Sequence, residues 1–282
     1  MNHNSILSQI ASENNITFKN SLRFHGGDIN DVFLLKGSEN VVVKMNDATR
    51  FPGMFDAEAK GLKLLESSNS FRIPKVLNLG NIENHSYLLL EYIEEGTTHT
   101  DFLQKFAENL VKLHRETSEF FGLDHDNYIG SLPQQNKHTD TASEFYISER
   151  LEPQIRIAFD NGFKFKNVSD FYKNISNEIP EEPPALIHGD LWAGNYLIDT
   201  SGMPVLIDPS VSFAPREMDL AMMKLFGGFQ DSIFKSYDEQ FPLVPKWQER
   251  LDIWQLYYLL VHLNLFGSGY YSQVELILKK YA

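Results

Sequence analysis

Three polar residues near position 200 have the types and spacing that phosphoryl transfer requires. Asp190 and Asn195 stand at D-x-x-x-x-N spacing, and Asp208 follows further along the chain. The apolar runs 186–187 and 205–207 precede the two aspartates, which predicts that strand ends hold both carboxylates. A carboxylate can take the proton of an attacking hydroxyl group, and an amide and a second carboxylate are the oxygen ligands that Mg²⁺ prefers. The segment therefore predicts a phosphotransferase site with Asp190 as base and Asn195 and Asp208 on the metal.

Each of these residues, taken alone, also has a purely structural explanation. His-Gly-Asp at 188–190 is a common turn, and Asn and Asp are frequent in hairpins. Together, however, His188, the two aspartates and Asn195 occur in the order found in kinases and are flanked by apolar strands. The combination favours a kinase over a chance set of turn residues.

The N-terminal third has the pattern of a lobe that covers ATP. Gly26 and Gly27 lie between two strand-like runs, where glycine lets the backbone approach phosphates closely, although a plain hairpin turn is the alternative. Lys44 ends a β-branched run, and Glu58 lies on the next predicted helix, 55–67. Such a pair positions the α- and β-phosphates in kinases. The alternative is a solvent-exposed lysine and a surface glutamate.

Further strand-like runs at 73–77 and 86–93 complete a small sheet of about five strands. The polar, glycine-containing stretch after Ile93 suits a hinge between lobes. If the small lobe covers ATP, the extended backbone at Glu91, Tyr92 and Ile93 is expected to contact the adenine edge, and an ordinary exit from a strand is the alternative. The predicted lobes are residues 1–93, which cover ATP, and residues 94–282, which carry catalysis and substrate binding.

The larger lobe is predicted to be mainly helical, which gives an α+β fold. Glu217 and Asp219 precede a helix, and Asp219 could cap that helix or hold the catalytic loop by accepting backbone hydrogen bonds. The aromatic residues near the C-terminus are assigned to the core first and to substrate contact second. The predicted helices after the hinge span residues 101–116, 144–161, 166–179, 247–266 and 273–281.

Composition restricts the classes of function. The chain has 282 residues and is 42% hydrophobic, which suffices for a substantial core. Its net charge of -13 argues against a nucleic-acid partner, and the absence of cysteine excludes disulfides and thiolate chemistry. The N-terminal segment lacks a signal-peptide pattern, and His262 and Asn264 interrupt the most apolar C-terminal run. We therefore expect a cytoplasmic protein that does not bind membranes.

With these residues identified, the chain resembles the fructosamine kinase (ketosamine-3-kinase) family, within the aminoglycoside-phosphotransferase-like, protein-kinase-like fold. The resemblance runs near full length, and its most specific parts are HGDLWAGN from His188 and EMDLAMMKLFGGF from Glu217. It implies ATP and Mg²⁺ as cofactors and transfer of phosphate to the 3-hydroxyl of a ketosamine, whose ester then decomposes and frees the amine. Trp192 would face the sugar, and we also place His188, Glu217 and Asp219 on the substrate side. Thr141-Ala142 replaces a usual tryptophan, so the acceptor wall is expected to differ.

Other functions remain open at this stage. A kinase for choline, an aminoglycoside or homoserine would share the ATP machinery and differ only in its acceptor pocket. A silent nucleotide-binding module would not need Lys44, Asp190, Asn195 and Asp208 together. No segment ending in Ala-Pro-Glu follows Asp208, which disfavours a protein kinase, and a metal hydrolase would need more ligands. The expected partner is a small or protein-bound ketosamine, and the sequence does not predict the oligomeric state.

Overall fold

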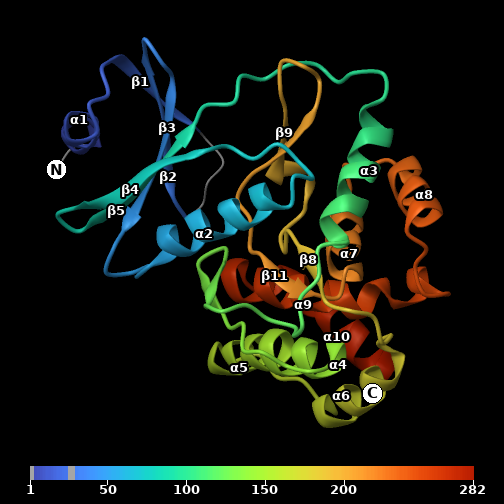
Figure 1. The fold of residues 1–282 in the computed structure, drawn as a ribbon. Coiled ribbons are helices and arrows are strands. Elements are labelled where there is room, and N and C mark those ends of the chain that lie inside the picture. The colour runs from blue at the N-terminus through green and yellow to red at the C-terminus, as the bar shows by residue number, and fades with distance from the viewer. Residues whose placement is uncertain (1–2, 25–28) are drawn as a thin grey trace.

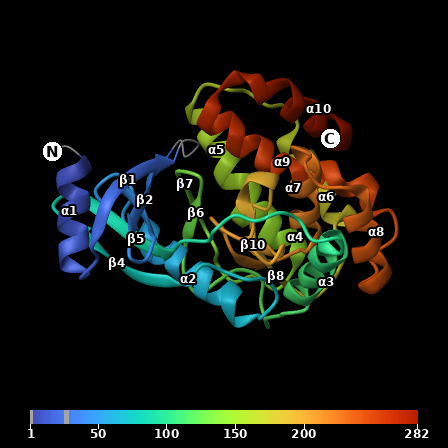
Figure 2. The ribbon, with the colours of Figure 1, turned by 90° about the horizontal axis from the view of Figure 1, so that it is seen from above.

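The computed structural model describes residues 3–24 and 29–282. Gly26 and Gly27 lie outside the described residues, so their contact with ATP phosphates stays a prediction. The chain forms a β-rich lobe from its N-terminal part and a larger, mainly helical lobe from the rest (Figures 1 and 2). This is the α+β, two-lobed architecture that the sequence predicts.

The N-terminal lobe is a five-stranded antiparallel sheet with strand order β1-β2-β3-β5-β4. Side chains alternate between the two faces of a strand. Val43 of β3 therefore packs with Ile10 of α1 on one face, and Leu88 of β5 packs with Leu62 of α2 on the other. The elements are α1 (His3–Glu13), β1 (Phe18–Phe24), β2 (Asp31–Gly37), β3 (Val41–Asp47), α2 (Met54–Ser67), β4 (Val76–Ile82) and β5 (His85–Glu91).

One strand of this sheet begins later than predicted. The sequence suggested residues 73–77, whereas β4 spans Val76–Ile82. Pro74 has no backbone N–H and so cannot donate a hydrogen bond within a sheet, which fits a start beyond it. The β4–β5 turn is correspondingly short, and Glu83 adopts a left-handed conformation there with a φ of 53°.

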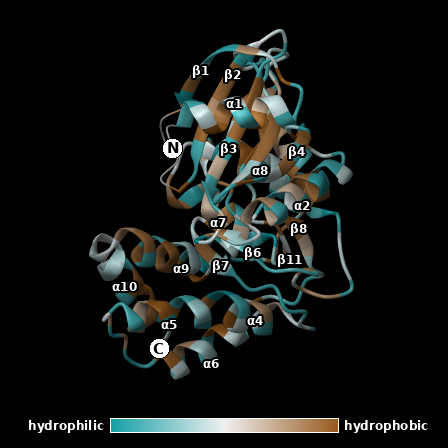
Figure 3. Cartoon of the chain, turned by 90° about the vertical axis from the view of Figure 1, so that its left-hand side faces the viewer, coloured by the Kyte–Doolittle hydropathy of each residue, from teal (hydrophilic) through white to brown (hydrophobic). Residues whose placement is uncertain are grey.

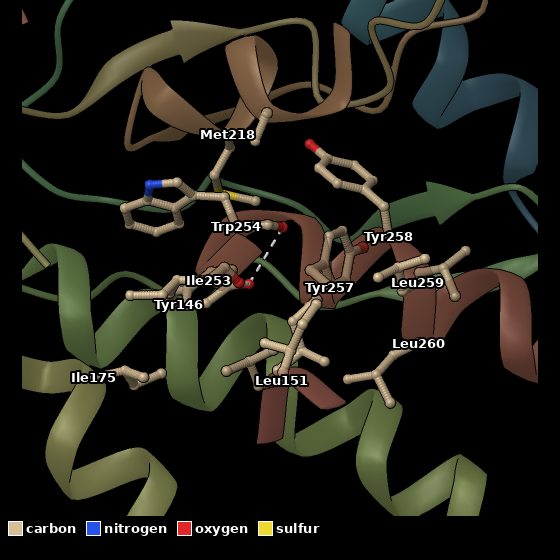
Figure 4. Close-up of a cluster of buried hydrophobic side chains, with 14 of the residues drawn as sticks. Tyr146, Leu151, Ile175, Met218, Ile253, Trp254, Tyr257, Tyr258, Leu259 and Leu260 are labelled. Atoms are coloured by element: carbon tan, nitrogen blue, oxygen red, sulfur yellow. Dashed lines mark hydrogen bonds between the residues drawn. The ribbon is translucent and has the colours of Figure 1, made fainter. Parts of the chain in front are cut away.

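The helical lobe is built around α9. Most of its middle turns are buried, whereas Gln248, Glu249 and Phe266 near its ends are exposed, and its Trp254 and Tyr257 pack with Tyr146 in the core (Figure 4). The Tyr146 hydroxyl donates a hydrogen bond to the Ile253 carbonyl. The helices are α3 (Phe102–His114), α4 (Ala142–Phe145), α5 (Glu152–Asp160), α6 (Val168–Glu178), α7 (Glu217–Leu225), α8 (Asp231–Gln240), α9 (Trp247–Phe266) and α10 (Tyr271–Tyr281). A π-helical segment, Tyr146–Leu151, joins α4 to α5, and short 3₁₀ turns occur at Ala193–Asn195 and Ser268–Tyr270.

Short strand pairs connect these helices. A hairpin of β9 and β10 follows Asn195, and β6 and β7 form a second hairpin. Hydrophobic residues concentrate on the sheet strands and on α9 (Figure 3). Within residues 3–24 and 29–282, none of the helices combines the length and apolar character that a membrane span requires. The pairs are β6 (Asn127–Ile129) with β7 (Leu132–Gln134), β8 (Ala185–Ile187) with β11 (Ser212–Ala214), and β9 (Tyr196–Ile198) with β10 (Pro204–Leu206).

Candidate active site

A cleft of about 690 Å³ is lined by residues of both lobes. The sheet and α2 supply one side, and the other side comes from the β8–β9 loop, the segment after β10 and the ends of α7 and α9. Six of the residues selected from the sequence line this cleft together: Lys44, Glu58, Asp190, Trp192, Asn195 and Asp208.

Lys44 joins the two lobes through a pair of carboxylates. The alternation of β3 directs Val43 toward α1, so Lys44 faces α2. Its Nζ lies 2.7 Å from Glu58 Oε1 and 3.0 Å from Asp208 Oδ1. Burial alone would lower the pKa of Lys44, but the charges of Asp208 and Glu58 raise it above its usual value. The lysine is therefore a buried, permanent cation and not a solvated surface residue.

Asp208 adopts an unusual backbone conformation. Its φ of 55° is in the left-handed region, which costs a residue with a side chain about 1 kcal/mol or more. Backbone hydrogen bonds fix the strands on either side, since Ile207 donates to the Asn195 carbonyl and Ser210 donates to the His188 carbonyl. The side chain is 48% exposed, and its Oδ2 accepts no hydrogen bond from the described residues. These backbone hydrogen bonds therefore maintain a strained backbone that keeps the Asp208 carboxylate exposed, where it can bind a ligand.

Asp190 and Asn195 are directly linked. The Asn195 amide nitrogen donates to the Asp190 carbonyl at 2.8 Å and to Asp190 Oδ2 at 3.0 Å. Burial raises the pKa of Asp190 to about 7, the hydrogen bond from Asn195 opposes this rise, and the charges of Asp208 and Asp219 add to it. A carboxylate with a pKa near neutrality is well matched to accept a proton at physiological pH.

The oxygen atoms of Asn195 and Asp208 fit a hard cation. Asn195 uses its amide nitrogen for Asp190, which leaves Oδ1 without a hydrogen bond from the described residues. Asp208 likewise keeps Oδ2, since Oδ1 accepts from Lys44. In the part of the chain that the structure describes, no cluster of three or more His or acidic residues could hold a metal alone. A cation here would complete its shell with water and phosphate oxygens, as Mg²⁺ commonly does.

His188, which we expected on the substrate side, is fully buried beneath the cleft. Its Nε2 donates to the Ile207 carbonyl at 3.0 Å, and its Nδ1 accepts from the Asp190 backbone N–H at 3.3 Å. Burial lowers the pKa of His188, so the ring stays neutral, as one donating and one accepting nitrogen require. The expectation of substrate contact is corrected: His188 supports the backbone of Asp190.

Glu217 and Asp219 are also buried and do not reach the cleft. The Asp219 carboxylate accepts from the backbone N–H groups of His188 at 2.8 Å and Gly189 at 2.9 Å, which is the alternative role considered from the sequence. Glu217 accepts from Arg250 at 2.6 Å and from the Trp254 indole N–H at 2.8 Å. Both carboxylates are fully used within the protein, which corrects their placement on the substrate side.

Two other expectations concern the walls of the site. Ala142 packs in the core of the helical lobe and does not line the cleft, so it is not part of an acceptor wall. The Glu91 side chain pairs with Arg72 at 2.8 Å, and Ile93 is buried. The adenine contact proposed for the backbone at Glu91, Tyr92 and Ile93 stays a prediction.

Several cleft residues were missed by reasoning from the sequence. The β6–β7 hairpin contributes Tyr128 and Gly130, and the C-terminal aromatic residues assigned to the core contribute His262 and Phe266. A signal was present for His262, because it interrupts an otherwise apolar run. No such signal marked Phe266, since an aromatic residue at a helix end is equally compatible with the core.

The sheet lobe, the helical lobe and the Lys44-to-Asp208 contact across the cleft define a phosphotransferase with a protein-kinase-like fold. The predicted fold class is confirmed by a solved amicoumacin kinase, which is 12% identical, covers 100% of this chain and 93% of its own, and superposes with a TM-score of 0.61.

The chain belongs to the fructosamine kinase family, which matches residues 1–282, and this confirms the resemblance seen in the sequence. A protein from Enterococcus faecium named "probable ketoamine kinase" is 38% identical over 262 residues, or 91% of this chain and 93% of that protein. The structure of a protein assigned as a fructosamine-3-kinase from Haemophilus somnus is 28% identical, covers 98% of this chain and 96% of its own, and has a TM-score of 0.88.

Proposed function

We propose that the protein transfers the γ-phosphoryl group of ATP to the 3-hydroxyl group of a ketosamine. The observation that carries the proposal is the meeting of Lys44, Asp190 and Asp208 in one cleft of a chain that belongs to the fructosamine kinase family. The acceptor is inferred from the relatives, whose names refer to ketoamines and to a fructosamine-3-kinase.

In this proposal the lobe of residues 1–93 holds the nucleotide and residues 94–282 hold the acceptor. Lys44, kept cationic by Glu58, binds the α- and β-phosphates. Gly26, Gly27 and the backbone at 91–93 contribute main-chain contacts to the phosphates and the adenine, respectively. ATP is abundant in the cytoplasm, where we expect the protein to act.

Asn195 Oδ1 and Asp208 Oδ2 would hold the divalent metal, which we propose to be Mg²⁺. When bound, the metal offsets negative charge on the phosphate oxygens. The two ligands come from segments joined by the backbone hydrogen bond between Ile207 and Asn195, so their separation is fixed by the fold. This rigidity would keep the phosphates in a constant position relative to Asp190.

Asp190 accepts the proton of the 3-hydroxyl as its oxygen attacks the γ-phosphorus. The bond from that phosphorus to the β–γ bridging oxygen breaks, ADP leaves, and the proton remains on the Asp190 carboxylate until it is lost to water. Trp192 would stack on the sugar. The resulting phosphate ester decomposes and releases the amine, which reverses glycation of a metabolite or of a protein.

A panel assay of ATP consumption tests the proposal. Purified protein with ATP and Mg²⁺ is given fructosyl-lysine, ribulosyl-lysine, choline and an aminoglycoside in parallel, and Asp190→Asn serves as the inactive control. We expect turnover with the ketosamines only. Turnover with choline or the aminoglycoside, and none with either ketosamine, would reject the proposed acceptor while leaving the kinase assignment in place.

A further inference from the structure

The acceptor side of the cleft exposes large aromatic side chains. Trp192 and Phe226 are each 42% exposed and Phe266 is 54% exposed, and all three line the same cleft. Exposed apolar residues that gather in a concave site are typical of ligand-binding surfaces, whereas isolated ones need no explanation. The clustering of these three aromatic side chains therefore points to a ligand group that covers them.

Four of the rings form one continuous surface, which we call the aromatic wall: Phe226, His262, Phe266 and Tyr270. The His262 ring is central, with centroid distances of 4.6 Å to Phe226, 5.5 Å to Phe266 and 5.1 Å to Tyr270. Its members come from the residue that follows α7, from the last turns of α9 and from the 3₁₀ turn after it. Because α9 is anchored in the core, the backbone that carries His262 and Phe266 is held in place.

Trp192 also lines this part of the cleft, and its indole is seated on a glycine. A Cβ placed on Gly194 would lie 2.2 to 2.6 Å from three ring carbons of Trp192, so only glycine allows the ring to lie there. Gly228, next to the wall, packs against Ala193 with a similarly close approach of 2.5 Å for an added Cβ. The loop that carries Trp192 and the loop after Phe226 are therefore held in a fixed relative position by direct contact.

The chemistry of the aromatic wall differs from that of the phosphate side. Among the described residues, the charged side chains that line the cleft are Lys44, Glu58, Asp190 and Asp208, and none belongs to the wall or its neighbouring loops. His262 Nδ1 donates to the Tyr258 carbonyl at 2.8 Å, which leaves Nε2 as an acceptor. Ring faces attract ammonium groups and pack against apolar groups, but they offer a carboxylate no partner.

We infer that the aromatic wall binds the amine side of the ketosamine, next to the sugar on which Trp192 is proposed to stack. This subsite selects ketosamines of apolar or aromatic amines, including the side-chain amine of lysine, over those of amino acids whose carboxylate lies next to the linkage. The secondary ammonium at the linkage lies against the ring faces and donates to His262 Nε2. The inference rests on the proposed function, because it presupposes that the acceptor is a ketosamine.

Three ketosamines of the same sugar test this selectivity: the fructosyl derivatives of benzylamine, of Nα-acetyl-lysine amide at its side chain, and of glycine. We expect kcat/KM for the glycine derivative to be about 10-fold lower than for the other two, mainly through KM, which is the scale on which apolar pockets discriminate. Trp192 gives a second readout, because Trp247 and Trp254 are buried. Binding of the benzylamine derivative should shield Trp192 fluorescence from quenching by acrylamide.

Variants of the aromatic wall separate its contribution from catalysis. Phe266→Ala removes an exposed ring, so folding is retained, and it should reduce the preference for benzylamine over glycine to less than about 3-fold. Gly194→Ala should raise KM for every ketosamine, because it displaces the Trp192 indole. The control is Phe159→Ala, which removes a phenylalanine that is 45% exposed and does not line the cleft, and it should preserve the wild-type preference.

The outcomes distinguish this inference from the proposed function. Equal use of the glycine and benzylamine derivatives by the wild type would overturn the inference and leave the proposed function intact. An unchanged preference in Phe266→Ala would overturn the role of the wall in the same way. If none of the ketosamines is phosphorylated while another acceptor is, the proposed function fails and the inference fails with it.

Discussion

The amide nitrogen of Asn195 lies 3.0 Å from Asp190 Oδ2, so the proposed metal ligand also holds the proposed base. The two ends of one amide group have different roles, since the nitrogen donates to Asp190 and the oxygen, which accepts no hydrogen bond from the described residues, is the proposed metal ligand. The position of a metal and the position of the base therefore depend on each other. This coupling explains why the spacing between the two residues is a strong signal in the sequence.

Replacing Asp190 with asparagine should stop proton transfer and preserve the site. The side chain keeps its shape and can still accept the hydrogen bond from Asn195, but it no longer takes a proton. We expect kcat to fall by roughly 10²–10⁴-fold with the affinity for ATP nearly unchanged. Steady-state kinetics and calorimetric titration of ATP measure the two quantities. Near-normal turnover would show that another group is the base.

The same variant should change how stability depends on pH. Burial raises the pKa of Asp190 to about 7 in the folded protein, against about 3.9 for an aspartate in an unfolded chain. Between these values only the folded state holds the proton, so the free energy of unfolding of the wild type falls as the pH rises from 4 to 7.

The Asp190→Asn variant has no carboxyl group at position 190 that could gain or lose a proton. It should match the wild type near pH 4 and be more stable by about 1–3 kcal/mol at pH 8. Urea unfolding with a metal chelator and without nucleotide measures the difference at each pH. Parallel curves for the two proteins across pH 4 to 8 would contradict the assigned burial of this carboxylate.

Asp208→Asn tests the metal site without breaking the backbone. Asparagine tolerates the left-handed conformation at position 208 better than alanine, so the fold should persist. The loss of charge should lower turnover by roughly 10²-fold or more and remove the Mg²⁺ dependence of ATP binding. Calorimetry with and without Mg²⁺ reports this dependence directly. A folded variant with wild-type affinity for Mg²⁺-bound ATP would remove Asp208 from the metal site.

Asp219→Asn should impair catalysis from beneath the cleft. Both carboxylate oxygens accept backbone N–H groups, from His188 and from Gly189, and an amide supplies only one acceptor. The unsatisfied N–H should cost about 1–3 kcal/mol of stability and shift the loop that carries Asp190, so kcat falls.

The matched control for this change is Asp199→Asn. Asp199 is also buried, its Oδ1 accepts from the backbone N–H groups of Ser201 and Met203 in the β9–β10 turn and its Oδ2 accepts from Arg72, and it does not line the cleft. We expect it to lose stability and keep kcat. If both variants lose kcat in proportion to stability, Asp219 has no specific effect on the catalytic loop.

The catalytic residues were predictable because each is marked by local sequence. Asp190 and Asp208 follow apolar strands, and Lys44 and Glu58 lie on a strand and on the helix after it. How deeply each carboxylate is buried was not predictable from the local sequence. Nothing local distinguishes the exposed Asp208 from the buried Asp219, because their burial depends on the packing of α3 and α7 around the catalytic loop.

The acceptor side was harder to predict for two physical reasons. The strands of β6 and β7 span only Asn127–Ile129 and Leu132–Gln134, which is too short for an alternating pattern to stand out. Helix α9 has no distinct polar face, so its sequence does not show that His262 and Phe266 leave the core and enter the cleft. Only the tertiary arrangement reveals the aromatic wall.

The position of the transferred phosphate tests the central claim most directly. The protein is incubated with ATP, Mg²⁺ and fructosyl-lysine, and the product is examined by mass spectrometry and by phosphorus–proton correlation NMR before it decomposes. We predict one added phosphate that couples to the proton on C3 of the sugar, formed roughly 10²-fold or more slowly by Asp190→Asn. A phosphate on any other hydroxyl, or no phosphorylated ketosamine from an enzyme that readily phosphorylates choline or an aminoglycoside, would contradict a ketosamine 3-kinase.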